Sequence, residues 1–194
     1  MTEVALGTGY GSHEAFTRAF RARFGVSPLR FRAALARREV PAGFLPRIAR
    51  LPARRVAFVR HVGPYDRAVE AFERLAAWAA PRGLLANAML GVYFDDQDIT
   101  PPERTRCDAG LFVREHVRGE GEVCVRELPG GDHAVFRHAG EVPERRRFYE
   151  VAYRTWLPSI GRRPSGAPPF EVYALSARGL DQATTHVHVP LRPR

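Results

Sequence analysis

An internal repeat constrains the fold of this chain more than any other feature of its sequence. Residues 57–63, AFVRHVG, match residues 134–140, AVFRHAG, 77 positions later. In both copies a strand-like segment leads through a glycine into a helical pattern that carries a tryptophan, Trp78 in the first and Trp156 in the second. Self-similarity of this kind is the signature of a duplicated structural unit.

The repeat continues to the end of each half. Val92 and Tyr93 correspond to Val172 and Tyr173, 80 positions later. Both halves then close on a further predicted strand, at residues 108–113 and 186–191. We therefore expect an α+β domain made of two β-α-β-β units, with a cleft along the pseudo-two-fold axis where small ligands usually bind.

One acidic residue interrupts the apolar strand pattern of residues 168–173, PPFEVY. An unpaired charge among buried aromatic residues is costly, so Glu171 needs a partner, which we expect to be a ligand. The offset of 80 places Gly91 at the equivalent position of the first half, and this break in symmetry is typical of a ligand-facing position. The alternatives are a surface glutamate and a glutamate paired with an arginine such as Arg137.

Aromatic residues near Glu171 in the predicted fold are candidate pocket walls, although core packing also explains each ring taken alone. An aromatic box with one carboxylate suits a delocalised or quaternary cation. Strand alternation puts Phe170 and Val172 on one face of the sheet and Glu171 and Tyr173 on the other. The candidate ligand-binding residues are Glu171, Tyr173, Trp156, Tyr93, Tyr149, Tyr153, Phe136 and Phe170.

The first 40 residues predict a small all-α segment. Ser12 can cap a helix with apolar residues at helical spacing, Gly25 ends that helix, and Ser27 with Pro28 begins another. All 30 basic residues of the chain are arginine. Residues 1–40 hold seven of them against three acidic residues, a net charge per residue about three times that of the remainder. This density indicates a nucleic-acid partner for the segment.

Residues 9–32, GYGSHEAFTRAFRARFGVSPLRFR, resemble the second helix-turn-helix of AraC-family transcriptional regulators. Such regulators carry two units, and the first is missing here. We therefore expect a partial helix-turn-helix at residues 1–40 with weakened DNA binding, followed by a linker at 41–46. A helical cap on the next domain is the alternative. The resemblance implies that His13, Glu14, Thr17 and Arg18 face the major groove and that Ser27 and Arg32 lie nearer the DNA backbone.

Residues 47–194 resemble the GyrI-like effector-binding domain. The similarity is carried by LPARRVAFVRHVGPY, ELPGGDHAVFRHAG, PPFEVY and HVHVPL, in that order. It implies the duplicated β-α-β-β fold, a central pocket for amphipathic and often cationic molecules, and Glu171 as the pocket glutamate. Domains of this family often follow an AraC-type DNA-binding region and also occur alone, and some hydrolyse reactive electrophiles.

The remaining features narrow the class of protein. The hydrophobic fraction of 45% and the charged fraction of 26% are typical of a globular chain. No apolar run is long enough to span a membrane, and the sequence shows no export leader. These features predict a cytoplasmic protein without a membrane partner. Cys107 and Cys124 lack metal-site spacing, and His186 and His188 share a strand face without a third ligand. We therefore predict no metal and no cofactor, and the sequence assigns no oligomeric state.

Three functions follow from these observations. The first is a DNA-binding transcriptional regulator, N-terminally incomplete, that senses a small amphipathic or cationic effector in a GyrI-like pocket. The second is a stand-alone module that binds or sequesters such a ligand. The third, ranked last, is a small hydrolase in which Glu171 acts as base and Tyr173, Tyr149 or Tyr93 polarises the substrate. Under the first two functions no residue is catalytic.

Overall fold

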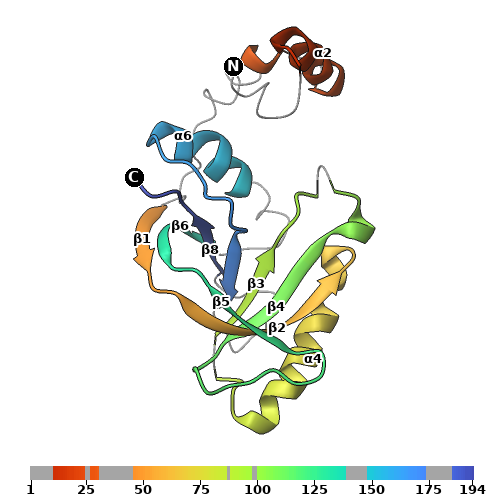
Figure 1. Cartoon of the computed structure of the whole chain (residues 1–194), viewed down its shortest axis with the longest axis vertical. Helices are drawn as coiled ribbons and strands as arrows, with labels where there is room; N and C mark the ends of the chain where they lie inside the picture. Colours follow the sequence, from red (N-terminus) through yellow and green to blue (C-terminus); the bar gives the residue numbers. More distant parts are fainter. Residues whose placement is uncertain are drawn as a thin grey trace.

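The computed structural model describes residues 11–24, 27–30, 46–86, 88–97, 100–138, 148–173 and 185–194. It shows the expected α+β architecture, in which eight antiparallel strands form one sheet in the order β1-β6-β8-β7-β3-β4-β2-β5 (Figure 1). The strands are β1 (Arg47–Leu51), β2 (Arg54–Val62), β3 (Met89–Tyr93), β4 (Arg106–Phe112), β5 (Cys124–Leu128), β6 (Gly131–His138), β7 (Phe170–Tyr173) and β8 (Thr185–Pro190).

Two helices accompany the sheet, one in each half of the repeat. The first is α4 (Val69–Ala79), and the second, which we call the second-half helix, spans residues 148–159 and includes the π-helix η4 (Ala152–Trp156) and α6 (Leu157–Ser159). Short 3-10 turns are η1 (Tyr65–Arg67), η2 (Ala80–Arg82) and η3 (Pro102–Arg104). Among the described residues, no helix is both long enough and apolar enough to cross a bilayer.

The duplicated unit contains one strand more than the sequence predicted. Each half runs β-β-α-β-β, because only Pro52 and Ala53 separate β1 from β2, and only Pro129 and Gly130 separate β5 from β6. Proline has no amide hydrogen to donate to a sheet ladder, so each proline interrupts what the sequence pattern indicates as one strand. The prediction of a duplicated α+β domain is confirmed, with this additional bend in each half.

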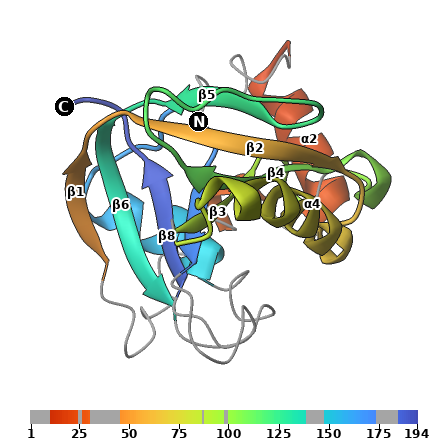
Figure 2. The same ribbon diagram turned by 90° about the horizontal axis from the view of Figure 1, so that it is seen from below.

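The two bent strand pairs curl the sheet toward closure. Arg47 in β1 lies opposite Val135 in β6, and Arg54 in β2 lies opposite Leu128 in β5, which is one continuous register. The two edge strands, β1 and β5, continue through the bends into β2 and β6, so the bends join the two ends of the sheet. Figure 2 shows β1 beside β6 and β2 beside β5. A Cβ on Gly130 would lie 2.5 Å from the Ala53 amide nitrogen, so this close approach of the two bends requires glycine.

Both helices cover the same face of the sheet, which we call the helix face. α4 buries apolar residues at helical spacing against strands β2 and β4, and the second-half helix does the same against β6 and β8. The two resulting clusters include Phe72, Leu75, Val59 and Leu111 in the first half, and Val151, Leu157, Phe136 and Val187 in the second. A third cluster on the opposite face contains Val56, Leu90, Val92, Leu128 and Phe170.

The second-half helix differs from α4 in its π-helical turn. Pro158 lies two residues after the end of η4, and its nitrogen cannot donate the hydrogen bond that an α-helix would direct to the carbonyl of Arg154. Because this hydrogen bond cannot form, the helix widens into a π-helical turn before the proline. Local departures from regular α-helical hydrogen bonding are common near proline. The side chains of Tyr153 and Trp156 project from this turn.

The N-terminal helix begins where the sequence predicts. α2 (His13–Phe24) starts after Ser12, whose Oγ accepts a hydrogen bond from the Ala15 amide at 3.1 Å, and Glu14 lies in its first turn. Residues 28–30 are again helical, and the Ser27 Oγ accepts a hydrogen bond from the Arg30 amide at 3.3 Å. These contacts confirm the two predicted helix starts. Residues 1–10 and 31–45, with Arg32 and most of the predicted linker, lie outside the described residues.

Candidate functional site

Glu171 lies where the two halves of the repeat meet. In the ladder between β3 and β7, Glu171 lies directly opposite Gly91, which is also its equivalent in the repeat. A two-fold rotation that exchanges the halves therefore maps this pair onto itself, so the pseudo-two-fold axis passes between the two residues. The side chain of Glu171 shares the helix face with Tyr173, and only 3% of the residue is exposed.

Two tyrosine hydroxyls hold the carboxylate of Glu171. Tyr149, in the second-half helix, donates a hydrogen bond to Oε1 at 3.0 Å, and Tyr173, on the same strand as Glu171, donates one to Oε2 at 3.2 Å. The hydroxyls of Tyr173 and Tyr93 lie 2.7 Å apart and share a further hydrogen bond. Three tyrosines and the buried carboxylate of Glu171 thus form one hydrogen-bonded network that joins segments far apart in the sequence.

Gly91 provides the space that this chain of hydroxyls occupies. A Cβ at position 91 would lie 2.7 Å from the Tyr173 hydroxyl oxygen and 2.9 Å from that of Tyr93. Any side chain there would displace both tyrosines. The asymmetry between Gly91 and Glu171 therefore has a steric cause. Position 171 carries the carboxylate, and position 91, opposite it, must lack a side chain so that the tyrosine hydroxyls fit.

Burial keeps the tyrosines of the second-half helix protonated. The pKa of Tyr149 is raised well above its ordinary value, first by burial and then by the negative charge of Glu171. Tyr153 stacks on Tyr149 with ring centroids 6.3 Å apart, and burial raises its pKa to about 12. Both hydroxyls are therefore neutral hydrogen-bond donors at physiological pH.

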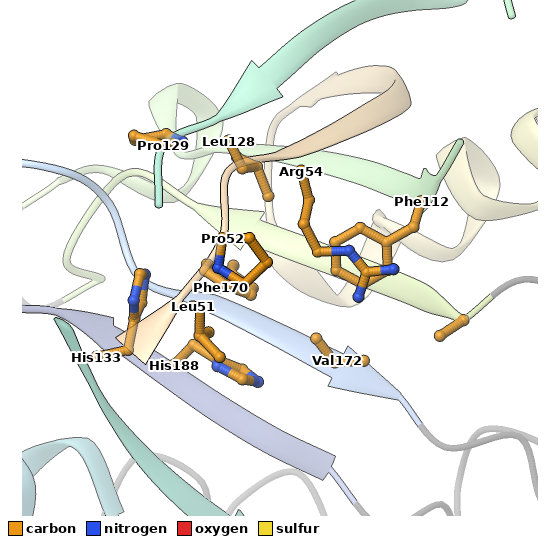
Figure 3. A pocket seen from close by; sticks show the side chains of 11 residues that line it. Leu51, Pro52, Arg54, Phe112, Leu128, Pro129, His133, Phe170, Val172 and His188 are labelled. Carbon is orange, nitrogen blue, oxygen red and sulfur yellow. The ribbon is translucent and has the colours of Figure 1, made fainter. Parts of the chain in front are cut away.

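The other predicted wall residues fall into two groups. Phe136 and Trp156 meet edge to face, with centroids 5.6 Å apart, in the helix-face cluster that also includes Tyr149 and Tyr153. Phe170, in contrast, lies on the opposite face and lines a separate cavity there (Figure 3). The structure therefore does not bring Phe170 to the Glu171 carboxylate. Arg137, the alternative partner for Glu171, alternates with Phe136 on β6 and is likewise on the opposite face.

Phe72 and Tyr65 support the site but were not among the predicted site residues. Phe72 packs edge to face on Tyr173 at 5.8 Å, and Tyr65 packs edge to face on Tyr93 at 5.1 Å. Helical spacing on α4 marks Phe72 as buried, but no sequence signal shows that it contacts Tyr173. Tyr65 follows the glycine turn of the first half, and nothing in the sequence reveals its contact with Tyr93.

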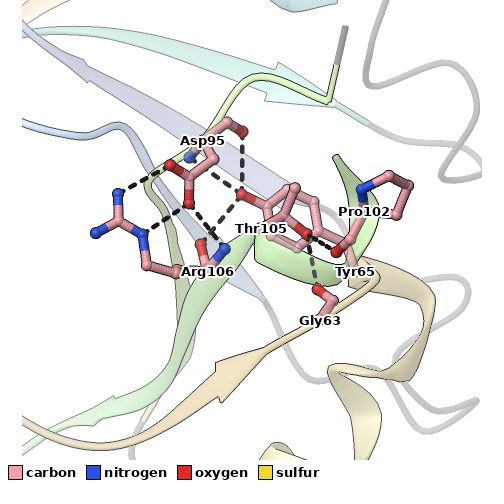
Figure 4. A network of polar contacts seen from close by, with 6 residues as sticks. All are labelled: Gly63, Tyr65, Asp95, Pro102, Thr105 and Arg106. Atoms are coloured by element: carbon pink, nitrogen blue, oxygen red, sulfur yellow. Dashed lines mark hydrogen bonds and ion pairs between the residues drawn. The ribbon is translucent and has the colours of Figure 1, made fainter. Parts of the chain in front are cut away.

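Tyr65 is fixed by a polar network at the start of β4 (Figure 4). Its hydroxyl lies 3.0 Å from the Asp95 carbonyl and 3.1 Å from that of Arg106, and accepts a hydrogen bond from the Asp95 amide. Asp95 in turn forms a bidentate ion pair with Arg106, at 2.8 and 2.9 Å. Thr105 ties the same segment to the turn by donating to the Gly63 carbonyl at 2.7 Å. The network holds Tyr65, and through it Tyr93, in place.

This arrangement suits a ligand with a positive charge and apolar surface. A buried carboxylate is stabilised by an opposite charge in contact with it, and aromatic faces attract cations. Tyr149 and Tyr173 already donate their hydroxyl hydrogens to Glu171, so their oxygens offer acceptors for a polar group on the same ligand. Within the described part of the chain, no group of three or more His, Cys, Asp or Glu side chains could hold a metal ion.

The predicted DNA-contacting residues lie on α2 and just after it. His13, Glu14 and Arg18 are exposed, and Thr17 and Ser27 are half-buried. The hydroxyl oxygen of Thr17 is itself buried, so it points away from solvent. Of this set, three charged or titratable side chains are open to a partner.

Comparison with known proteins shows which family the chain belongs to. A family model described as the GyrI-like small molecule binding domain matches residues 45–192. The chain is 38% identical over 92 residues to the SPbeta prophage-derived putative transcriptional regulator YosT of Bacillus subtilis, a match that covers 46% of this chain and 62% of YosT. It is 30% identical over 151 residues to the DNA gyrase inhibitor of Edwardsiella ictaluri, which covers 75% of this chain and 97% of that protein.

Solved structures share the fold at low sequence identity. EcmrR in a cryo-EM complex with DNA aligns with a TM-score of 0.67 at 14% identity, covering 100% of this chain and 77% of EcmrR. SAV2435 bound to tetraphenylphosphonium aligns with a TM-score of 0.52 at 13% identity, covering 76% of this chain and 94% of SAV2435. With the family match over three quarters of its length, the chain belongs to the family of GyrI-like small molecule binding domains.

Proposed function

We propose that the helix-face site binds a cationic amphipathic small molecule through Glu171. The observation that carries this proposal is a carboxylate with 3% exposure, placed on the pseudo-two-fold axis between two helices and held by two tyrosine hydroxyls. A cation that reaches the carboxylate gains a charge pair in a largely dehydrated site, where electrostatic attraction is stronger than in water. The rings of Tyr149 and Tyr153 provide aromatic surface for its apolar part.

The proposal is tested with a cationic probe and a neutral probe of similar shape. Tetraphenylphosphonium and triphenylphosphine oxide are titrated calorimetrically into the wild-type protein and into Glu171→Gln. Loss of one partner of a buried charge pair costs about 2–5 kcal/mol, so the variant should bind the cation at least about 30-fold more weakly. Binding of the neutral probe should change little.

Glu115→Gln is the matched control, because Glu115 is exposed and lies outside the site. It removes one negative charge without altering the carboxylate on the axis. Equal weakening of both probes in Glu171→Gln, or equal weakening of the cation in both variants, would contradict the proposal.

We further propose that the domain serves a transcriptional regulator, with the N-terminal helices reading DNA. Support comes from the arginine-rich first 40 residues, from the Ser12 and Ser27 caps, and from the exposed His13, Glu14 and Arg18. Effector binding would then change DNA affinity only if the effector binds the two conformations of the regulator differently. The alternative is a stand-alone module that binds or sequesters its ligand.

Gel-shift titration separates these two roles. This chain and a version extended upstream of Met1 are titrated against promoter DNA and against unrelated DNA, each with and without tetraphenylphosphonium. Preference for promoter DNA that disappears in Arg18→Ala supports the regulator. Equal affinity for both DNAs in both versions supports the stand-alone module.

Hydrolysis is a second candidate activity, favoured by the pairing of a carboxylate with tyrosine donors. Glu171 would take a proton from water as the water oxygen attacks an electrophilic carbon, and a tyrosine hydroxyl would donate to the oxygen that gains negative charge. The Tyr149 and Tyr173 hydroxyls lie 3.0 and 3.2 Å from the carboxylate and donate to it, so one of them would have to turn its hydrogen toward the substrate oxygen. Turnover of an epoxide panel by the wild type that is abolished in Glu171→Gln would establish the activity, and equal rates would exclude it.

A further inference from the structure

A cavity lies on the face of the sheet opposite Glu171. It has a volume of about 270 Å³ and lies between strands β7 and β8 and the two bends of the sheet, Leu51-Pro52 and Leu128-Pro129, which we call the Leu-Pro bends (Figure 3). Because Phe170 and Val172 alternate with Glu171 on β7, the sheet itself separates this cavity from the helix-face site. Its lining residues are Leu51, Pro52, Arg54, Ala88, Phe112, Leu128, Pro129, His133, Phe170, Val172 and His188.

The walls of this cavity suit a flat apolar group. Phe170 and His188 stack with ring centroids 4.6 Å apart and an interplanar angle of 3°, and His133 meets the Phe170 ring edge-on at 5.7 Å. Leucine, proline and valine side chains supply the rest of the surface. An apolar cavity of roughly 150 Å³ is enough to bind benzene, so this one has room for a single ring and a small substituent.

The charge of the cavity is positive. None of its lining residues is acidic, and Arg54 brings a guanidinium that lies 3.9 Å from the centroid of the Phe112 ring. Within the part of the chain that the structure describes, the guanidinium of Arg54 forms no ion pair or hydrogen bond. Burial lowers the pKa of His188 to about 4, so its imidazole is neutral at physiological pH, and its buried Nδ1 has no hydrogen-bond partner among the described residues.

Comparison of the two repeats shows that only the first half brings a positive charge to the cavity. Arg54 corresponds to Gly131 in the second half, at the offset of 77 that relates Leu51 to Leu128 and Pro52 to Pro129. The bends therefore contribute matched apolar walls, while only one end of the cavity has a guanidinium. A ligand with one apolar end and one negative end has a single orientation that satisfies both.

We infer that this cavity binds a small apolar monoanion, an aromatic or branched aliphatic carboxylate, whose carboxylate pairs with Arg54 and whose apolar group lies against Phe170 and His188. Arginine presents a planar fork that matches a carboxylate, and such charge-assisted hydrogen bonds are stronger than neutral ones. The chain would then have two sites of opposite preference on the two faces of one sheet.

Three probes of one shape test the charge preference. Benzoate, benzyl alcohol and benzylamine are titrated into the ¹⁵N-labelled full chain, and amide shifts are followed by NMR. Benzoate should shift the signals of Phe170, Val172 and His188 and bind more tightly than the other two. Since hydrogen bonds to charged groups contribute about 1.5–3 kcal/mol, Arg54→Gln should weaken benzoate binding about tenfold or more and leave benzyl alcohol nearly unchanged.

Two controls keep the test specific. Arg67→Gln removes an exposed arginine of η1 outside the cavity and should leave benzoate affinity unchanged. Ala88→Trp adds a large side chain at an exposed lining residue and should reduce binding of benzoate without perturbing the sheet core.

The inference fails if benzoate produces no shifts in these residues, or if Arg54→Gln and Arg67→Gln weaken it equally. Equal affinity for all three probes would also refute it. Glu171→Gln separates this site from the first, because it should abolish preference for tetraphenylphosphonium yet leave benzoate binding intact.

Discussion

Replacing Gly91 with alanine should break the site without touching the carboxylate. The added Cβ would lie 2.7 Å from the Tyr173 hydroxyl oxygen, 2.8 Å from Tyr93 Cε2 and 2.9 Å from the Tyr93 hydroxyl oxygen. These distances are well below van der Waals contact, so at least one ring must move. Tyr173 has little freedom to do so, because it is 7% exposed and packs against Phe72.

The cost combines overpacking with a lost hydrogen bond. Extra methyl groups in a packed core cost about 1–3 kcal/mol. Loss of the Tyr173 hydrogen bond to Glu171 adds about 1.5–3 kcal/mol, as expected for a bond to a charged group. We expect Gly91→Ala to lower the free energy of unfolding by about 3–5 kcal/mol, or the melting temperature by about 6–20 °C.

Urea denaturation measures this effect, with Gly166→Ala as the matched control. A Cβ on Gly166 meets nothing within 4 Å, so that variant should stay within about 0.5 kcal/mol of wild type. Tyr173→Phe in the Gly91→Ala background removes the nearest clashing atom and should recover part of the loss. If Gly91→Ala is as stable as wild type, or if the effects of the two substitutions are strictly additive, then the claim that glycine at position 91 makes room for the tyrosine hydroxyls is wrong.

Two further predictions concern charge and pH. Burial raises the folded-state pKa of Tyr149 and Tyr153 above their unfolded values, to about 12 for Tyr153. The stability that these two tyrosines contribute should therefore be complete below about pH 10 and fall as the pH rises from there through their folded-state pKa values. Urea midpoints at increasing pH measure this loss, and Tyr153→Phe should reduce it. Asp108 is fully buried and pairs with Arg60 at 2.7 Å, so Asp108→Asn should cost about 2–3 kcal/mol in urea denaturation. Glu122→Gln, in an exposed ion pair, should cost less than about 1 kcal/mol, and equal losses would contradict this ranking.

The sequence predicts the fold of this chain well because the repeat is strong. Duplication, the approximate strand positions and the cap at Ser12 all follow from spacing and residue type. The additional strands β1 and β5 do not, because each continues the strand after it and only a Leu-Pro bend divides them. That bend becomes visible only when the register of the curled sheet is known.

The candidate site was predictable in part. Alternation along β7 correctly separates Phe170 from Glu171. The break in symmetry at Gly91 was interpreted as the mark of a ligand-facing position, which stays a prediction, and its steric cause depends on where two tyrosine hydroxyls from different strands meet. The contact of Tyr149 with Glu171 depends on how a helix sits across the sheet, which residue spacing does not specify.

A crystal structure of the complex with tetraphenylphosphonium tests the central claim most directly. The account predicts the phosphonium on the helix face, between α4 and the second-half helix, with its charge next to the Glu171 carboxylate and its rings against Tyr149 and Tyr153. A cation bound on the opposite face of the sheet, or on the helix face without contact to Glu171, would contradict the claim that this buried glutamate is the ligand-binding group.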